Sequence, residues 1–293
     1  MTTTSADVVI EERPRNRLRS IYSSIFSSRL SKIGLCMIVG IIVFIVAGSL
    51  LTPYSPYAIS VSINKPPSYA HPFGTDYLGH DLFSQIVWGA YPSLFVAMGG
   101  ALGSVVLGFF VGVFGGYYRK LDGVLGGASD VVMAFPVLPL LIMLGSLFPA
   151  TNLFIMSLLI AVLWPPVARS VRAQVASAKK LPFVDAARTG GLRDIEIVLR
   201  IIVPEVGSIA MAYFIVNVSL TIILTTALQF LGVGNPNAVS WGSTLYWAQQ
   251  FGFYAGAWWW ILVPGAIITL TATGFAFIGF ALEEKFNPRL KII

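Results

Sequence analysis

The side chains best suited to chemistry gather between positions 71 and 81. His71, Asp76, His80 and Asp81 could bind a metal ion, because imidazole and carboxylate groups are common metal ligands. Their spacing does not favour a metal site, since no His-x-x-x-His pair or Glu/His face is formed. The alternative is that the two aspartates cap turns or short helices in a folded loop. We favour this alternative and expect no metal site.

Other catalytic patterns are missing from the sequence. A Walker A loop needs a lysine directly after a glycine, and none of the lysines has that neighbour. Serine and histidine are not paired in any hydrolase pattern, and the apolar segments carry no series of acidic or histidine residues of the kind that proton relays use. We therefore expect no enzymatic activity, and any process that needs ATP would have to draw its energy from another protein.

The longest polar stretch between apolar segments, 181–205, begins like a short helix. Pro182 suits a first helical turn, because its φ is fixed and its missing N–H is not needed there. Asp185 lies in the same turn, where a carboxylate suits the helix dipole. The Gly190-Gly191 pair then predicts the end of the helix, since glycine accepts the left-handed conformation.

The middle of this stretch is typical of a docking surface. Ala186 and Ala187 are small, so another surface can approach the helix backbone closely. Positive charge surrounds this small face, from Arg188, Arg193 and Arg200. A short helix with a small apolar face and a charged rim between two apolar segments predicts a site that docks on a soluble partner.

The same residues resemble the EAA loop of ABC importer permeases. That pattern is Glu-Ala-Ala, three residues, Gly, nine residues and Ile-x-Leu-Pro, and the spacing matches from Asp185 to Pro204. Asp185 stands for Glu and Val203 for Leu. The resemblance implies that an ATPase subunit docks on this loop. The implied coupling residues are Pro182, Phe183, Asp185, Ala186, Ala187, Arg188, Gly191 and Pro204.

Composition identifies an integral membrane protein. Hydrophobic residues make up 56% of the chain and charged residues 11%, against about 25% charged residues in a soluble domain. The single cysteine, Cys36, permits no intramolecular disulfide. The net charge of +6 could suggest nucleic acid, but the distribution of the charges along the chain excludes that interpretation.

Six apolar segments can cross a bilayer core of about 30 Å. The expected spans are 33–52, 91–117, 121–147, 153–168, 206–230 and 258–282. They leave an N-terminal arm over 1–32, a loop over 53–88, the docking loop over 169–205 and a tail over 283–293. Within the arm, Arg15 to Lys32 is expected to lie along the membrane surface as a helix.

Polar and aromatic residues near the spans have expected roles. Asp130 lies inside the third span, and we favour a structural ion pair with Arg169 or Arg172 over a substrate contact. Asn217, in the uncharged fifth span, and Asp130 are the candidates for a translocation path. Trp241, Trp247 and 258–260 resemble interfacial anchors.

Basic residues are distributed very unequally between the two sides. All of the 19 Lys and Arg residues except Lys65 lie in the arm, the 119–120 turn, the docking loop or the tail. The positive-inside rule therefore puts both termini and the docking loop in the cytoplasm, and the loop over 53–88 outside. This asymmetry explains the net charge without nucleic acid.

Two further stretches resemble one family. Phe73 to Asp81 is similar to the Phe-Gly-Thr-Asp-x-x-Gly-Arg-Asp loop of dipeptide/oligopeptide permeases, with His80 in place of Arg, and Trp164 to Gln174 also resembles those proteins. From about Arg17 to Arg289 the chain resembles the C-type membrane subunit of dipeptide/oligopeptide/nickel ABC importers. The resemblance implies six transmembrane helices in the type I importer fold.

The resemblance also implies partners. These are a homologous permease that completes a heterodimer, two ATPase subunits that bind ATP and Mg, and an extracytoplasmic solute-binding protein. No cofactor is expected on this chain itself. The cargo stays open between peptides, oligosaccharides and a nickel complex. A secondary transporter and a membrane-embedded enzyme are the alternatives, disfavoured by the missing ionisable and catalytic groups.

Overall fold

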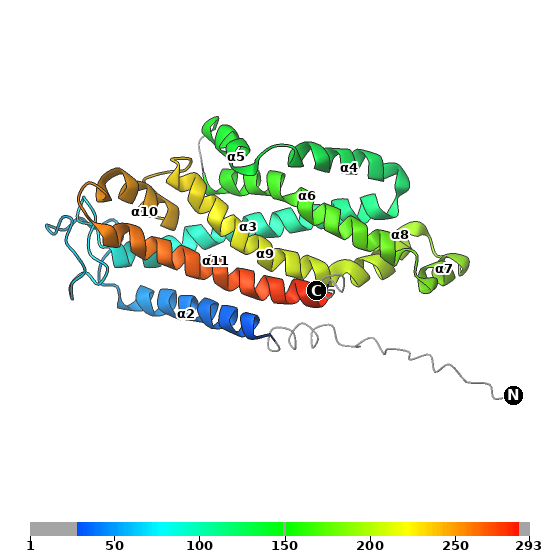
Figure 1. The fold of residues 1–293 in the computed structure, drawn as a ribbon, viewed down its shortest axis with the longest axis horizontal. Coiled ribbons are helices and arrows are strands. Elements are labelled where there is room, and N and C mark those ends of the chain that lie inside the picture. Colours follow the sequence, from blue (N-terminus) through cyan, green and yellow to red (C-terminus); the bar gives the residue numbers. More distant parts are fainter. Residues whose placement is uncertain (1–27, 149–150, 287–293) are drawn as a thin grey trace.

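The computed structural model describes residues 28–148 and 151–286 of the 293-residue chain. Within them the regular elements are helices, which run side by side along the long axis of the molecule (Figure 1). Five helical stretches among the described residues are long and apolar enough to cross a membrane. They are α2 (Arg29–Leu51), α3 (Leu82–Tyr117), α6 (Asn152–Ala178), a continuous stretch ending in α9 (Val203–Phe230), and α11 (Trp258–Phe286). The expected all-α polytopic class is confirmed.

Shorter helices complete the bundle. They are α4 (Arg119–Met133), α5 (Val137–Ser146), α7 (Pro182–Thr189), α8 (Asp194–Ile197) and α10 (Trp241–Trp247), with π-helical turns η1 (Val198–Ile202) and η2 (Ala248–Gly252). In Figure 1, α7 and α8 lie at one end of the long axis, and α10 lies at the other end with the loop that precedes α3. The bundle therefore has two different ends.

Several helices are longer than the expected spans. The second begins at Leu82 instead of Tyr91, because Asp81 caps it by accepting a 2.8 Å hydrogen bond from the Ser84 N–H. Its 36 residues extend about 54 Å at 1.5 Å per residue, well beyond a bilayer core. The fourth continues through Pro165 to Ala178, so the prolines do not end it.

The two ends of the chain also differ from expectation. Arg29 to Lys32 form the first turn of α2 rather than a surface helix, and the rest of the expected surface helix lies mainly outside the described residues. At the other end, α11 includes the acidic residues Glu283 and Glu284, which were expected in the polar tail. The tail beyond Phe286 lies outside the described residues.

The third expected span, 121–147, is broken. Helices α4 and α5 meet at an angle of 84° across Ala134-Phe135-Pro136. Pro136 cannot donate the backbone hydrogen bond that a continuous helix needs, and it disfavours helical backbone at Phe135. Helices α4 and α5 count as a sixth candidate span only if the two bent halves together form one membrane crossing.

Helices α3 and α6 pack backbone against backbone. A Cβ added at Gly108 would lie 2.5 Å from the Trp164 carbonyl oxygen, and one at Gly112 would lie 2.6 Å from that of Ala168. Gly116 repeats the contact one turn further along, beside the Arg172 carbonyl. Small residues four apart let membrane helices approach closely, and Gly108 and Gly112 have this role between α3 and α6.

The loop that precedes α3 is held by two His–Asp pairs. His71 Nδ1 lies 3.0 Å from an Asp81 carboxylate oxygen, and His80 Nδ1 lies 2.7 Å from an Asp76 oxygen. Asp76 also accepts the N–H of Leu78 at 2.9 Å, which closes a turn. Both aspartates therefore act in turns or caps, as the second interpretation of this cluster predicts.

The tryptophans near the opposite end are mostly internal. Trp241 is fully buried against α3, where its indole N–H donates to the Ile86 carbonyl oxygen at 2.9 Å. Trp259 and Trp260 are also buried, whereas Trp258 is exposed. The expectation of interfacial anchors is therefore wrong for Trp241, Trp259 and Trp260. Trp241 is internal because α10 folds back into the bundle instead of forming an open loop.

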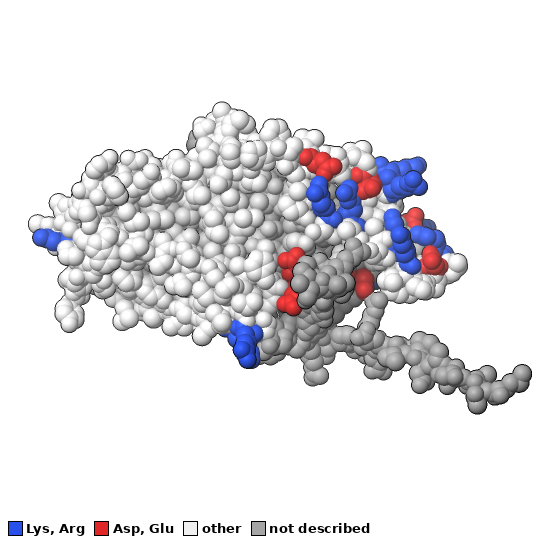
Figure 2. All heavy atoms as spheres, in the orientation of Figure 1, with Lys and Arg blue, Asp and Glu red and all other residues white. Residues whose placement is uncertain are grey.

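Charge is confined mainly to one end of the molecule. Figure 2 shows most of the visible charged side chains at the end where α7 lies, and a long uncharged surface over the rest of the bundle. A long, mostly uncharged surface beside a charged end is the pattern expected for a helical membrane protein.

Candidate functional site

The docking helix α7 forms where local signals predict it. It opens at Pro182 and ends at Thr189 with Gly190 as its C-cap, and Gly191 has a φ of +87°, the left-handed conformation that glycine accepts. The Leu192 N–H donates to the Ala187 carbonyl oxygen at 3.2 Å, which satisfies one of the last free carbonyls. A Cβ at Gly191 would meet no atom within 4 Å, so only its backbone conformation requires glycine.

The two faces of α7 have different surroundings. Val184 is fully buried, and Ala187 is half-buried against the same core cluster, which includes Tyr117 and Ile197. Pro182, Phe183 and Ala186 are exposed on the outer side. Ala187 therefore packs in part on its own bundle and Ala186 does not, and the expected docking contact of Ala187 stays a prediction.

A polar network ties α7 to the end of α3. The Tyr117 hydroxyl donates a 2.7 Å hydrogen bond to Asp194 Oδ1, and Arg188 Nη2 donates to the Tyr117 oxygen at 3.4 Å. Arg188 also lies 3.7 Å from Asp185 and 3.9 Å from Asp194. The Tyr117 contact, helped by these carboxylates, raises the pKa of Arg188 above its usual value. Arg188 thus holds the loop together as well as lining its rim.

Sequence reasoning missed Tyr117 and Asp194, which are far apart in the chain. The only local signal was that Tyr117 ends an apolar segment just before Arg119 and Lys120. That position predicts an interfacial aromatic residue, but it does not identify a carboxylate 77 residues later as its partner.

The docking loop leads into one long helical stretch. Residues Asp194 to Phe230 form 37 helical residues from this loop toward the other end of the bundle. Pro204 lies near the start of α9, directly after the π-helical turn η1. Its ring would crowd the carbonyl four residues earlier in a regular helix, and the wider turn accommodates it. Pro204 is therefore continuous with the fifth span instead of separating it from the loop.

Two ion pairs join α4 to α6 near the docking end. Arg169 Nη2 lies 2.7 Å from Asp130 Oδ1, and Arg172 Nη1 lies 2.9 Å from Asp122 Oδ1. The favoured structural pairing of Asp130 with Arg169 is thus present. The side chains of Arg169 and Asp130 are 53% and 63% exposed. Ion pairs this exposed are poorly suited to face lipid.

Asn217 lies inside the bundle. Its side chain is buried, and its amide nitrogen lies 3.5 Å from the Ser104 hydroxyl of α3. The nearby Thr221 hydroxyl donates to the Ala97 carbonyl oxygen at 2.8 Å. These contacts join α9 to α3. The structure therefore gives Asn217 a packing role, which differs from the path-lining role expected.

Comparison with known proteins identifies the family. Residues 104–292 match the family described as binding-protein-dependent transport system inner membrane component. A Brucella suis protein, named provisionally as a peptide transport system permease, is 34% identical over 90% of this chain and 89% of its own. The dipeptide transport system permease protein DppC of Alkalihalophilus pseudofirmus is 31% identical over 93% of this chain and 90% of its own. The chain belongs to the inner membrane permease components of binding-protein-dependent transport systems.

Proposed function

We propose that this chain is one permease subunit of an ATP-driven importer that moves peptides delivered by an extracytoplasmic binding protein. The names of the Brucella suis and Alkalihalophilus pseudofirmus relatives support peptides as the cargo class. A permease of this kind does not hydrolyse ATP itself. ATP and Mg²⁺ bind in two separate ATPase subunits, and this chain receives their movement through the docking loop.

The orientation follows from the charged end. The arm, the 119–120 turn, the docking loop and the tail carry all the basic residues except Lys65. The positive-inside rule supports a cytoplasmic position for both termini and for α7, in the plasma membrane of the cell. The opposite end, with the loop that precedes α3 and with α10, then faces the binding protein.

The observation that carries the proposal is how α7 is attached. Its outer side, with Pro182 and Ala186, is exposed, and its inner side is tied to α3 through Tyr117 and to α9 through the continuous helix from Asp194. A groove in an ATPase subunit would hold the outer side. Closure of two ATPases on ATP would move α7, and both attached helices would carry that shift into the membrane.

A second, homologous permease completes the path. The exposed pairs Asp130–Arg169 and Asp122–Arg172 support a water-filled or protein-covered face along α4 and α6, because exposed charges are costly against lipid. In this arrangement Asp130 lies beside the path as half of an ion pair, and the binding protein supplies most of the selectivity for cargo.

Uptake in vesicles tests the proposal. The chain is reconstituted with its partner permease and ATPases, and the cargo-loaded binding protein is added outside. We expect accumulation of labelled di- to hexapeptides that requires ATP inside, stops when the ATPase is inactivated, and continues when a protonophore collapses the proton gradient. Uptake that follows the proton gradient without ATP would instead identify a secondary transporter.

A further inference from the structure

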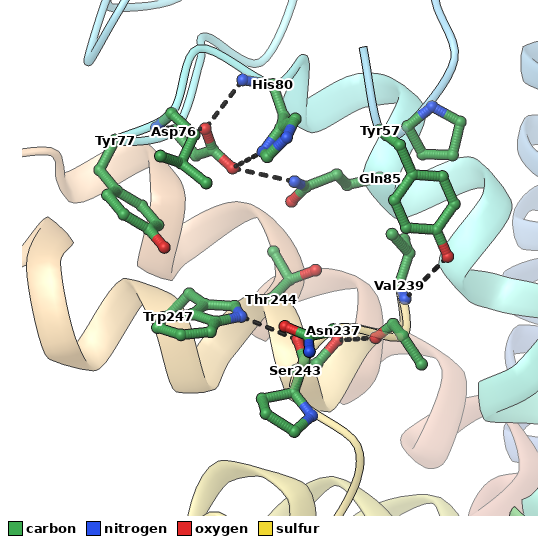
Figure 3. A pocket seen from close by; sticks show the side chains of 14 residues that line it. Tyr57, Asp76, Tyr77, His80, Gln85, Asn237, Val239, Ser243, Thr244 and Trp247 are labelled. Atoms are coloured by element: carbon green, nitrogen blue, oxygen red, sulfur yellow. Dashed lines mark hydrogen bonds and ion pairs between the residues drawn. The ribbon is translucent and has the colours of Figure 1, made fainter. Parts of the chain in front are cut away.

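A small pocket opens at the end of the bundle opposite the docking loop. It has a volume of about 240 Å³ and lies between the loop that precedes α3 and the segment that leads into α10 (Figure 3). Asp76, His80 and Gln85 lie on one side, and Thr244 and Trp247 lie on the other. Pockets for whole ligands are typically about 300–1,000 Å³. This pocket therefore suits one long side chain better than a peptide.

A fixed negative charge lies in the wall of this pocket. Asp76 is 3% exposed, and one of its oxygens accepts the N–H groups of Leu78 and His80 at 2.9 and 2.8 Å. Its other oxygen faces the His80 ring at 2.7 Å and the Gln85 amide nitrogen at 3.0 Å. No Lys or Arg is among the described residues that line the pocket, so Asp76 is its one carboxylate and no cationic chain of the pocket itself pairs with it.

The Asp76 side of the pocket offers one unpaired acceptor atom. Gln85 is 8% exposed and uses its nitrogen on Asp76, while its amide oxygen has no partner among the described residues. The Asp76 carboxylate faces His80 Nδ1, so Nε2 is the ring nitrogen that has no hydrogen-bond partner among the described residues. The rings of Tyr77 and Trp247, 5.7 Å apart, both stack with Phe251 and form an aromatic wall of the pocket.

We propose that this pocket receives a Lys or Arg side chain of the extracytoplasmic binding protein when that protein docks. The inference rests on the proposed function, which brings the binding protein to this end. The buried Asp76 carboxylate and the free Gln85 amide oxygen, in a lining without Lys or Arg, favour a cationic donor. Lys65 is the only basic residue that the sequence places at this end, so little positive charge on this chain opposes such a partner.

A double-mutant cycle tests the pocket directly. The complete transporter is placed in nanodiscs, and the Kd of its cargo-loaded binding protein is measured. In this chain, Gln85→Leu removes the free acceptor and Ala238→Met fills the pocket from the other wall without touching Asp76. Each surface Lys and Arg of the binding protein is replaced by Gln in turn. Lys65→Gln, which lies outside the pocket lining, is the matched control on this chain.

We expect each pocket variant to weaken docking roughly tenfold, as the loss of a charge-assisted hydrogen bond predicts. One cation of the binding protein should cause the same loss, and combining it with either pocket variant should add little further loss. Lys65→Gln should stay within about twofold of wild type. ATP-dependent uptake by the unmodified transporter is measured in parallel.

Three results would overturn the proposal. If no cation couples to the pocket while uptake is normal, the pocket is not a docking site and the importer function stands. If the pocket variants lose uptake but bind the binding protein normally, the pocket serves the cargo's ammonium group instead. If uptake is independent of ATP and of any binding protein, the importer function itself fails.

Discussion

The hydroxyl of Tyr117 donates a 2.7 Å hydrogen bond to Asp194, and this joins the last residue of α3 to the first residue of α8, the helix that follows α7. Tyr117 is buried in the core cluster beneath α7, with Val184 and Ile197. A force applied to α7 therefore has two routes into the bundle, one through α3 and one through the helical stretch that ends in α9.

Replacing Tyr117 by Phe should loosen this attachment. The ring keeps its packing, but Asp194 and Arg188 lose a shared partner, which costs about 0.5–1.5 kcal/mol for a typical hydrogen bond. We expect faster hydrogen exchange over residues 185–197 and more ATP hydrolysed per peptide transported. Tyr118→Phe is the control, since its hydroxyl has no hydrogen-bond partner among the described residues. Equal effects of the two variants would count against this role.

Gly191 should be required for its conformation and not for space. Its φ is +87° and a Cβ would meet nothing within 4 Å. Left-handed backbone costs most residues about 1–2 kcal/mol, and Asn tolerates it better. We expect Gly191→Ala to lower the stability of the loop, measured by local hydrogen exchange, and Gly191→Asn to be milder. Indistinguishable Ala and Asn variants would show that backbone strain is not the reason for glycine here.

The α3–α6 interface should not accept a larger residue at Gly112. A Cβ would lie 2.6 Å from the Ala168 carbonyl oxygen, and a backbone atom cannot move aside cheaply. Overpacking a close interface typically costs about 1–3 kcal/mol, so Gly112→Val should lower the thermal stability of the purified protein. Gly123→Val in α4 serves as the control, because a Cβ there meets nothing within 4 Å. A similar loss in both variants would point to intrinsic helix propensity instead.

The proposed orientation predicts which positions are labelled from outside. In a Cys36→Ser background, a cysteine at Tyr69, which is fully exposed, should react with an impermeant maleimide in intact cells. A cysteine at Thr189 should react only after the membrane is opened. The reverse pattern would invert the topology and would place α7 out of reach of any cytoplasmic ATPase.

Local signals predicted the parts of the site that depend on a few neighbouring residues. Pro182 and Gly191 define the ends of α7 because each restricts or permits a backbone conformation by itself. The pairing of Asp130 with Arg169 was also predictable, since a charge in an apolar segment needs a partner.

The burial of individual side chains could not be predicted, because it depends on contacts between residues that are far apart in the sequence. Ala187 has the same side chain as Ala186, and only the core cluster beneath the helix, with Tyr117 and Val184, makes one alanine half-buried and leaves the other exposed. Trp241 is similar, because its burial depends on the Ile86 carbonyl of a distant helix. Pro136 itself is a local signal for a break in the helix. The high hydropathy across 121–147 nevertheless led to the prediction of one continuous span.

The central claim, that an ATPase docks on the outer side of α7, is tested most directly by Ala186→Leu. Ala186 is exposed, so the larger side chain leaves this chain's own packing intact but holds a docked surface away. Overpacking by about 1–3 kcal/mol corresponds to roughly five- to hundredfold weaker association. The measurement is the Kd of the purified ATPase for the permease pair in nanodiscs, with thermal stability as the folding check. We predict weakened ATPase binding and lost uptake at unchanged stability, and wild-type binding with normal uptake would contradict the claim.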